Sequence, residues 1–323
     1  MRFSSQVAWT FATRLLMIVN SLVAGIIVAH WLGAEGVGQL AVINVTVATI
    51  VQLGSFGLPS SNTYFIAQDR AHFRAAAINS LIFALGVGAL LALALSGVAS
   101  LRPEWFGFVS PGLIHVAAIS IPFQLITLIG LNVLLAIGKL REFNLLDLAG
   151  QSFVLINAVL VLLILRQGLA TLITFNTAAS ILVGAVIVLL LVISGRSLAP
   201  SSWRADVALL RQMIVYGLKF HVSILAGTII IRADLLVVNH FRGAAEAGVY
   251  SVASQFALLL MLLPGVIATF LPMIALVLVS LSKFWTGSFD TSTWTLESWR
   301  HIASASGVKP AIWNSVWLSV VSA

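Results

Sequence analysis

Four charged side chains lie within long apolar segments of this sequence: Arg14, Lys219, Arg232 and Asp234. A charge at the centre of a hydrocarbon layer costs at least about 2.5 to 3.5 kcal/mol, so each is a candidate functional residue. A guanidinium and an ammonium group sheltered from water bind anions through charge-assisted hydrogen bonds. Arg14 and Lys219 therefore predict an anion site, and anchoring at the membrane surface is the alternative. For Arg232 and Asp234, near the end of their segment, we favour anchoring or an ion pair over a cavity contact.

Polar residues accompany these charges at helical spacing. Thr10, Arg14 and Asn20 share one face of the first apolar segment, which should meet a cavity or a neighbouring helix. Lys219 and Asp234 fall within about 60° of each other on a helix. Amides and hydroxyls in such segments line cavities or join helices. The side chains that we predict to line a cavity are Asn20, Gln52, Ser223 and Gln255.

The sequence contains no recognisable catalytic set. It has no cysteine, no phosphate-binding GxxxxGK[ST] motif and no histidines at metal-ligand spacing. We therefore predict that the protein is not an enzyme and that it uses no cofactor or metal.

The elements that position these residues must be membrane-spanning helices. Of the 323 residues, 60% are hydrophobic and only 8% are charged, with a mean hydropathy of +1.09. A soluble domain is about one-quarter charged, so most of this surface cannot face water. Spans need about 20 mainly apolar residues, which predicts an all-α polytopic bundle of eight helices. The predicted spans are 7–32, 40–58, 75–99, 113–137, 145–165, 169–193, 213–238 and 248–270.

Basic residues in the short loops predict the orientation, because cytoplasmic loops are enriched in Lys and Arg. A cytoplasmic N-terminus places Arg2, Arg70, Arg74, Lys139, Arg141, Arg196, Arg204 and Arg211 inside, and Arg102, Arg166 and Arg242 outside. We therefore predict a multi-pass protein of the cell inner (plasma) membrane with its N-terminus in the cytoplasm. No basic patch is long enough to predict a nucleic-acid site.

An internal repeat suggests two lobes. WLGAEGVGQLAV (31–42) aligns with FRGAAEAGVYSV (241–252), and both are predicted to be loops between helices. The matched pairs are Gly33 with Gly243, Ala34 with Ala244, Gly38 with Gly248 and Val42 with Val252. A chance match is the alternative in a sequence so rich in Gly, Ala and Val. A real repeat implies six helices in each lobe, and the second lobe here is incomplete.

The predicted organisation follows from this repeat. It comprises a six-helix lobe (1–194), a cytoplasmic linker (195–212), the first two helices of a second lobe (213–270) and a divergent segment (271–323).

Three segments carry a resemblance to a known family: WLGAEGVGQLAV, QLGSFGLPSSNTYFIAQ and RADLLVVNHFRGAAEAGVYSVASQ. Over about residues 1–270 the chain resembles the polysaccharide or O-antigen flippases of the multidrug/oligosaccharidyl-lipid/polysaccharide exporter superfamily. The resemblance implies two six-helix lobes that move an undecaprenyl-pyrophosphate-linked oligosaccharide across the inner membrane by alternating access. It also implies membrane lipids and polysaccharide assembly proteins as partners. The pyrophosphate would then be the anion that Arg14 and Lys219 bind.

Residues 271–323 resemble the start of an ABC transporter permease instead, with one helix followed by a loop rich in tryptophan. An ABC permease subunit is therefore an alternative function, although no cytoplasmic docking helix is found. A drug or cation antiporter of the same fold is another alternative, and it would favour buried carboxylates. The last alternative is that the chain is a non-functional fusion product.

Overall fold

The computed structural model describes residues 3–196 and 203–254, followed by isolated positions at 257, 281, 295, 296, 300, 310, 313 and 314. The side chains at 3–8, 228, 229, 231 and 232 are not among those described. Residues Ala8–Val252 form one compact unit, and the fold and site below belong to it. Most of the predicted eighth span and of the divergent segment 271–323 lies outside the described residues.

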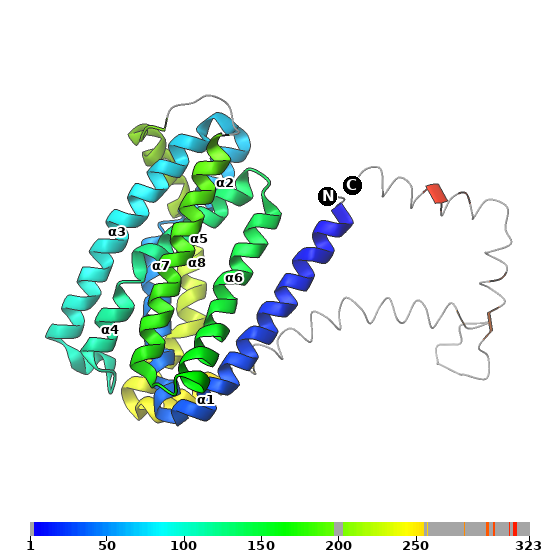
Figure 1. Cartoon of the computed structure of the whole chain (residues 1–323). Helices are drawn as coiled ribbons and strands as arrows, with labels where there is room; N and C mark the ends of the chain where they lie inside the picture. Colours follow the sequence, from blue (N-terminus) through cyan, green and yellow to red (C-terminus); the bar gives the residue numbers. More distant parts are fainter. Residues whose placement is uncertain are drawn as a thin grey trace. The chain divides into compact units, whose positions relative to one another are not determined.

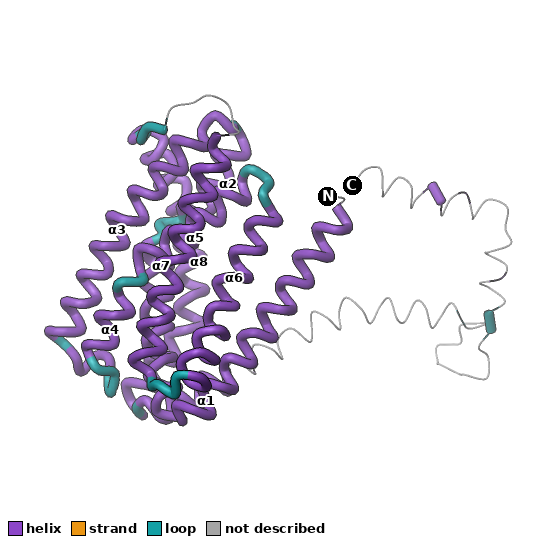
Figure 2. Tube along the Cα trace, viewed as in Figure 1, coloured by secondary structure: helices purple, strands orange, loops and turns teal. Residues whose placement is uncertain are grey.

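The described unit is a bundle of helices, and its residues form no strand (Figures 1 and 2). This confirms the predicted all-α polytopic bundle. The elements are α1 (Phe3–Gly54), α2 (Leu58–Gln68), η1 (Arg70–His72), α3 (Phe73–Leu101), η2 (Pro103–Phe106), α4 (Pro111–Ala118), α5 (Ile121–Ala136), α6 (Leu140–Ala158), η3 (Val159–Ile164), α7 (Leu169–Arg196) and α8 (Val207–Arg242).

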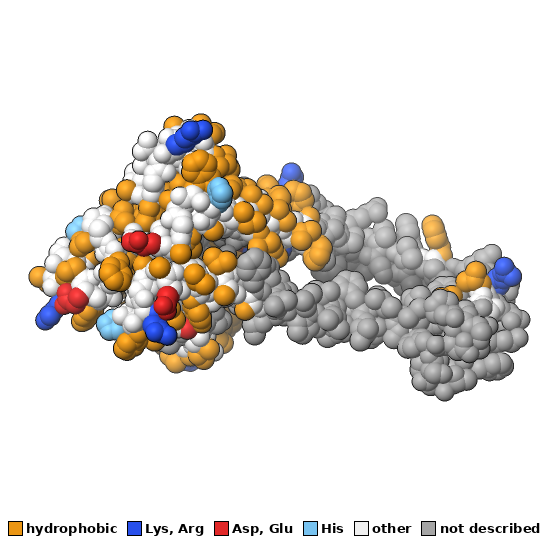
Figure 3. Space-filling view, turned by 90° about the horizontal axis from the view of Figure 1, so that it is seen from below, with side chains coloured by type: hydrophobic (Ala, Val, Ile, Leu, Met, Phe, Trp, Pro, Cys, Tyr) orange, Lys and Arg blue, Asp and Glu red, His pale blue; other side chains and the backbone are white. Residues whose placement is uncertain are grey.

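Apolar side chains cover the outside of these helices. Phe11, Ile26, Leu90 and Leu93 are each between 66% and 72% exposed. Viewed from the end where α8 finishes, hydrophobic side chains are spread over the visible surface among other side chains and backbone, and the charged side chains are few and scattered (Figure 3). Exposure of so many large apolar side chains is unfavourable in water and favourable in lipid. The bundle is therefore built to be surrounded by a membrane.

Six described stretches are long and apolar enough to cross a membrane. The first, Trp9–Gly54, has 46 residues. As one straight helix it would be about 69 Å long, more than twice a hydrocarbon core of about 30 Å. Gly33 breaks the helix with φ 64° and ψ −177°, so this stretch holds two spans. The described residues thus contain seven of the eight predicted spans, six of them before the linker.

The predicted loops at 31–42 and 241–252 are wrong in their extent. Only Gly33 and Gly243 leave the helical conformation, and a new helix starts at the next residue in each case. The two glycines share one backbone conformation, with φ 64° and ψ −177° at Gly33 and φ 93° and ψ 175° at Gly243. A residue with a Cβ rarely adopts this conformation, so a single glycine replaces a loop.

The helices that follow these two glycines meet through their backbones. A Cβ on Gly38 would overlap the carbonyl oxygen of Ala244, and a Cβ on Gly248 would overlap that of Ala34. Replacing each residue of the first contact by its partner in the repeat gives the second contact. A local two-fold relation therefore connects the two contacts. The described backbone therefore supports the internal repeat at these positions.

Two predicted spans are broken helices. The span 40–58 ends in a turn at Gly57 (φ 70°, ψ 11°), after which α2 continues as a helix that the sequence did not predict. The span 113–137 is divided into α4 and α5 just before Pro122. Proline lacks an N–H and clashes with the carbonyl four residues earlier, so it favours a helix start there. Gly88 makes room for this break, since a Cβ on Gly88 would lie 2.5 Å from the Cα of Pro122.

The linker between α7 and α8 is fixed to α3 at both of its described ends. The Arg74 guanidinium donates to the carbonyl of Gly195 at 3.0 and 2.7 Å. The Asn79 amide donates to the carbonyl of Asp206 at 2.7 Å and accepts from its N–H at 3.0 Å. The Asp206 carboxylate caps α8 by accepting from Leu209 N at 2.9 Å. α8 therefore begins at Val207, within the predicted linker.

Candidate functional site

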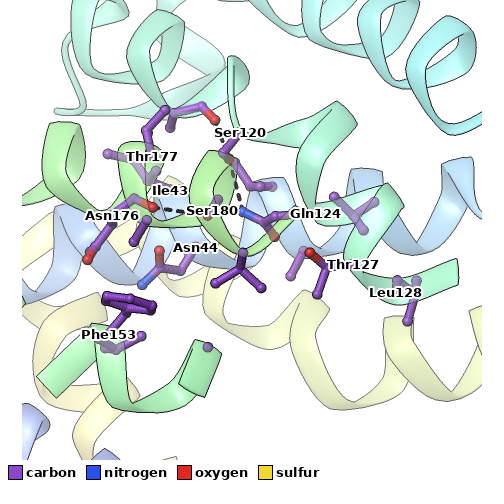
Figure 4. Close-up of a pocket in the computed structure, with 18 of the residues that line it drawn as sticks. Ile43, Asn44, Ser120, Gln124, Thr127, Leu128, Phe153, Asn176, Thr177 and Ser180 are labelled. Atoms are coloured by element: carbon purple, nitrogen blue, oxygen red, sulfur yellow. Dashed lines mark hydrogen bonds between the residues drawn. The ribbon is translucent and has the colours of Figure 1, made fainter. Parts of the chain in front are cut away.

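A cavity of about 550 Å³ lies inside the bundle, between the second half of α1 and the helices α4, α5, α6 and α7. Amide and hydroxyl side chains from four of these five helices gather around one space (Figure 4). The hydrogen-bonding residues are Asn44, Gln52, Ser120, Gln124, Thr127, Asn157, Asn176, Thr177 and Ser180. Asp147 is the one charged residue among the described residues that line the cavity. The cavity is thus nearly neutral, and its polar groups stand among apolar side chains of the same helices.

Hydrogen bonds hold part of this lining in place. The Gln124 amide donates to the Ser120 hydroxyl at 2.9 Å, which in turn donates to the Ala117 carbonyl at 2.6 Å (Figure 4). The Asn157 amide donates to the Asn176 side-chain oxygen at 2.9 Å. Ser120 lies between α4 and α5, so these two contacts join the end of α4 to the start of α5.

Asn44 and Gln52 are two amides of the lining whose whole polar groups remain available. Neither side chain makes a hydrogen bond to another described residue, although both line the cavity from the second half of α1. An amide offers two donors and one acceptor with two lone pairs. These two side chains can therefore bind a ligand that both donates and accepts hydrogen bonds.

A polar seam joins the first half of α1 to α6, beside the cavity. It has three contacts: Asn144 Nδ2 to Thr10 Oγ1 (2.8 Å), Arg14 Nη1 to Asp147 Oδ2 (2.9 Å) and Asn20 Nδ2 to Ser152 Oγ (2.9 Å). We call these six residues the α1–α6 seam. The polar face predicted on the first span therefore meets a neighbouring helix. Asp147 belongs to both features, since it pairs with Arg14 and lines the cavity.

α8 packs against α2 in the described unit. The backbones of Gly57 and Gly217 are in contact, and the Ser61 hydroxyl donates to the Met213 carbonyl at 2.5 Å. Tyr216 stacks on Tyr64 with ring centroids 4.4 Å apart. This packing buries one side of α8 and fixes which of its residues stay exposed.

The predicted site residues do not come together in one place. Gln52 lines the cavity, and Arg14 and Asn20 lie in the α1–α6 seam. Lys219 and Ser223 are exposed on α8, and no described contact joins Lys219 to Arg14. The joint anion site of Arg14 and Lys219 therefore stays a prediction.

The remaining predicted residues lie near the end of α8 or beyond it. Asp234 is exposed and accepts a hydrogen bond from the Tyr250 hydroxyl at 2.6 Å. The side chain of Arg232 and the whole of Gln255 lie outside the described residues.

The sequence interpretation missed Asp147, although a signal was present. Asp147 is a carboxylate within the predicted span 145–165, where it should have been counted with the other charges. It also missed Gln124, Asn157 and Asn176. Each is a single polar residue in a separate apolar segment, so the sequence gives no sign that they share a cavity.

Comparison with known proteins identifies the family. The model of a family described as "Polysaccharide biosynthesis protein" matches residues 4–277. The chain belongs to this family. The resemblance to polysaccharide flippases over about residues 1–270 is thereby confirmed, and the chain is a multi-pass membrane protein of this family.

Two solved structures share the fold. One is described as a structure of the "MATE multidrug transporter DinF-BH", with a TM-score of 0.62 at 16% identity. The other, described as "protein A", has a TM-score of 0.59 at 14% identity. Each match covers 80% of this chain and 60% of the solved chain. No curated protein matches the sequence.

Proposed function

We propose that this chain is part of a transporter that flips a lipid-linked oligosaccharide across the bacterial inner membrane, with its N-terminus in the cytoplasm. The observation that carries the proposal is the nearly neutral cavity, in which amides and hydroxyls from four helices stand among apolar side chains. Sugars present many hydroxyl groups, each of which donates and accepts hydrogen bonds, as the free amides of Asn44 and Gln52 do. Membership of the polysaccharide biosynthesis family supports this assignment.

The pyrophosphate of such a substrate requires cations. Arg14 is half exposed and pairs through Nη1 with Asp147, which lines the cavity, while its Nε and Nη2 groups make no hydrogen bond to a described residue. An arginine binds phosphate with two parallel hydrogen bonds, so these free groups suit a pyrophosphate. Lys219, exposed on α8, would supply a second positive charge. The expected partners are the lipid-linked oligosaccharide, membrane lipids and polysaccharide assembly proteins.

Transport in reconstituted vesicles tests this proposal. The chain is placed in proteoliposomes with an undecaprenyl-pyrophosphate-linked oligosaccharide, and the fraction that crosses the bilayer is measured with time. Arg14→Ala should reduce the rate at unchanged protein abundance. Arg102→Ala is the matched control, because this exposed arginine pairs with Glu104 in a loop away from the cavity. Equal rates for the native chain and Arg14→Ala would assign Arg14 to membrane anchoring.

A drug or cation antiporter is the second candidate function, and Asp147 favours it. Such a site needs a carboxylate in the cavity, and Asp147 is one. The ion pair with Arg14 argues against this role, since the carboxylate is already neutralised. Export of a cationic dye from vesicles that contain the chain would favour the antiporter, whereas flipping of the lipid-linked sugar alone would exclude it.

A further inference from the structure

Phe153 on α6 is the one aromatic residue among the described residues that line the cavity. Its side chain packs against the buried core on one side and is partly exposed. No ring of another described residue stacks on it. The face of an aromatic ring carries a partial negative charge, which attracts polarised C–H groups. The ring of Phe153 is therefore available to a ligand in the cavity.

Gly150 leaves open space beside this ring. It precedes Phe153 by three residues, so the two are neighbours on the face of α6 that lines the cavity. A Cβ on Gly150 would meet nothing within 4 Å. Any larger residue at this position would extend into the cavity. The glycine thus keeps a space beside Phe153 that a flat ligand ring can occupy.

Asn44 supplies a hydrogen-bonding group to the same space. It lines the cavity from the second half of α1, and its amide makes no hydrogen bond to a described residue. Figure 4 shows this amide on the same side of the space as the ring of Phe153. An aromatic face beside a free amide suits a ligand that is apolar on its face and polar at its edge.

A pyranose ring has this property. In its chair form, C–H bonds point away from the two faces of the ring, and equatorial hydroxyls project from its edge. The C–H bonds can meet the face of Phe153 while a hydroxyl at the edge donates to or accepts from Asn44. Ligand sites commonly combine apolar and aromatic walls with a few placed polar groups.

The order of residues along α6 gives the direction of such a ligand. Asp147, the partner of Arg14, lies six residues before Phe153 on the cavity face, about 9 Å along the helix axis. A phosphate on the free Nε and Nη2 groups of Arg14 leaves the sugar bonded to it within reach of Phe153. Later sugars would extend toward the amides of Asn157 and Asn176.

We propose that Phe153 is the platform for the first sugar of the lipid-linked oligosaccharide. This sugar is a pyranose that presents a C–H face to the ring, occupies the space beside Gly150 and hydrogen-bonds to Asn44. The inference rests on the proposed function and adds to it the position and the class of the first sugar.

Calorimetry of the full chain in detergent measures what the sugar contributes to binding. The two probes are farnesyl pyrophosphate and farnesyl pyrophosphate with one glucose attached. The ratio of their dissociation constants is the sugar gain. Phe153→Leu keeps an apolar side chain but removes the aromatic face, so the sugar gain should fall by about twofold to tenfold. The affinity of this variant for farnesyl pyrophosphate should not change. Phe153→Tyr retains the ring and should retain the gain.

Two further variants control for a general effect on the fold. Phe11→Leu is the matched control, because Phe11 is 70% exposed on α1 and does not line the cavity; it should keep the gain. Gly150→Leu fills the space beside Phe153 and should remove the gain. Its melting temperature should not fall, since a Cβ at this position meets no neighbour and leucine favours a helix more than glycine.

The outcomes separate this inference from the proposed function. Loss of the gain in Phe153→Leu and Gly150→Leu, with retention in Phe153→Tyr and Phe11→Leu, supports the stacking site. An unchanged gain in Phe153→Leu overturns the site and leaves the proposed function intact. Equal affinity of the native chain for the two probes also overturns it. Absence of flipping by the native chain in proteoliposomes removes the proposed function, and this inference with it.

Discussion

The contact between Gly38 and Gly248 allows one sharp test of the fold. In Gly38→Ala the new methyl group would overlap the carbonyl oxygen of Ala244 and lie 2.9 Å from the backbone N of Gly248. Both neighbours are helix backbone, so no side chain can rotate away, and the two helices must separate. Overpacking of this kind costs about 1 to 3 kcal/mol. The better helix propensity of alanine returns up to about 1 kcal/mol.

Gly86→Ala is the matched control for this change. Gly86 is an exposed glycine within α3, and a Cβ there would meet nothing within 4 Å. This variant receives the propensity gain alone and should be more stable than the native chain by about 1 kcal/mol. The two variants should therefore differ by the overpacking cost, about 1 to 3 kcal/mol, or about 2 to 6 °C in melting temperature for a chain of this size.

Thermal melting in detergent, followed by tryptophan fluorescence, measures the difference. The double variant Gly38→Ala/Gly248→Ala should lose less than the sum of the two single losses, because one separation of the helices accommodates both methyl groups. Equal melting temperatures for Gly38→Ala and Gly86→Ala would refute the close backbone contact and the local two-fold relation drawn from it.

Three further predictions concern the linker, the cavity and the orientation. Asn79 is 2% exposed and holds the backbone of Asp206 with two hydrogen bonds, so Asn79→Ala should lower stability by about 1 to 3 kcal/mol in the same melting assay. Asn44→Leu should slow flipping of the lipid-linked sugar without lowering the melting temperature, because Asn44 has no described hydrogen-bond partner to leave unpaired; an unchanged rate would contradict a sugar-binding cavity. The chain has no cysteine, so a single introduced cysteine reports on which side of the membrane its position lies. In intact cells a membrane-impermeant maleimide should label Glu104→Cys and should not label Asp69→Cys. The reverse pattern would contradict the proposed orientation.

The sequence alone located the membrane spans, because hydropathy is a local property of the chain. Each of the seven described spans lies where about 20 apolar residues occur together, and the stretch before the linker holds six. The matched pair Gly33 and Gly243 was also visible in the sequence. Their positive φ values show why glycine stands at both positions, since each replaces a whole loop by one residue.

Only the tertiary structure decided how these spans combine into a site. Arg14 was a conspicuous charge in the sequence, yet its partner Asp147 lies on a helix far along the chain. The cavity draws one or a few polar residues from each of several helices, and its existence depends on the rotation of every helix about its axis. That rotation is set by packing, such as Gly88 against Pro122, which no single segment encodes. Hydropathy along the chain therefore determines which residues enter the membrane, and packing between helices determines which of them face one another.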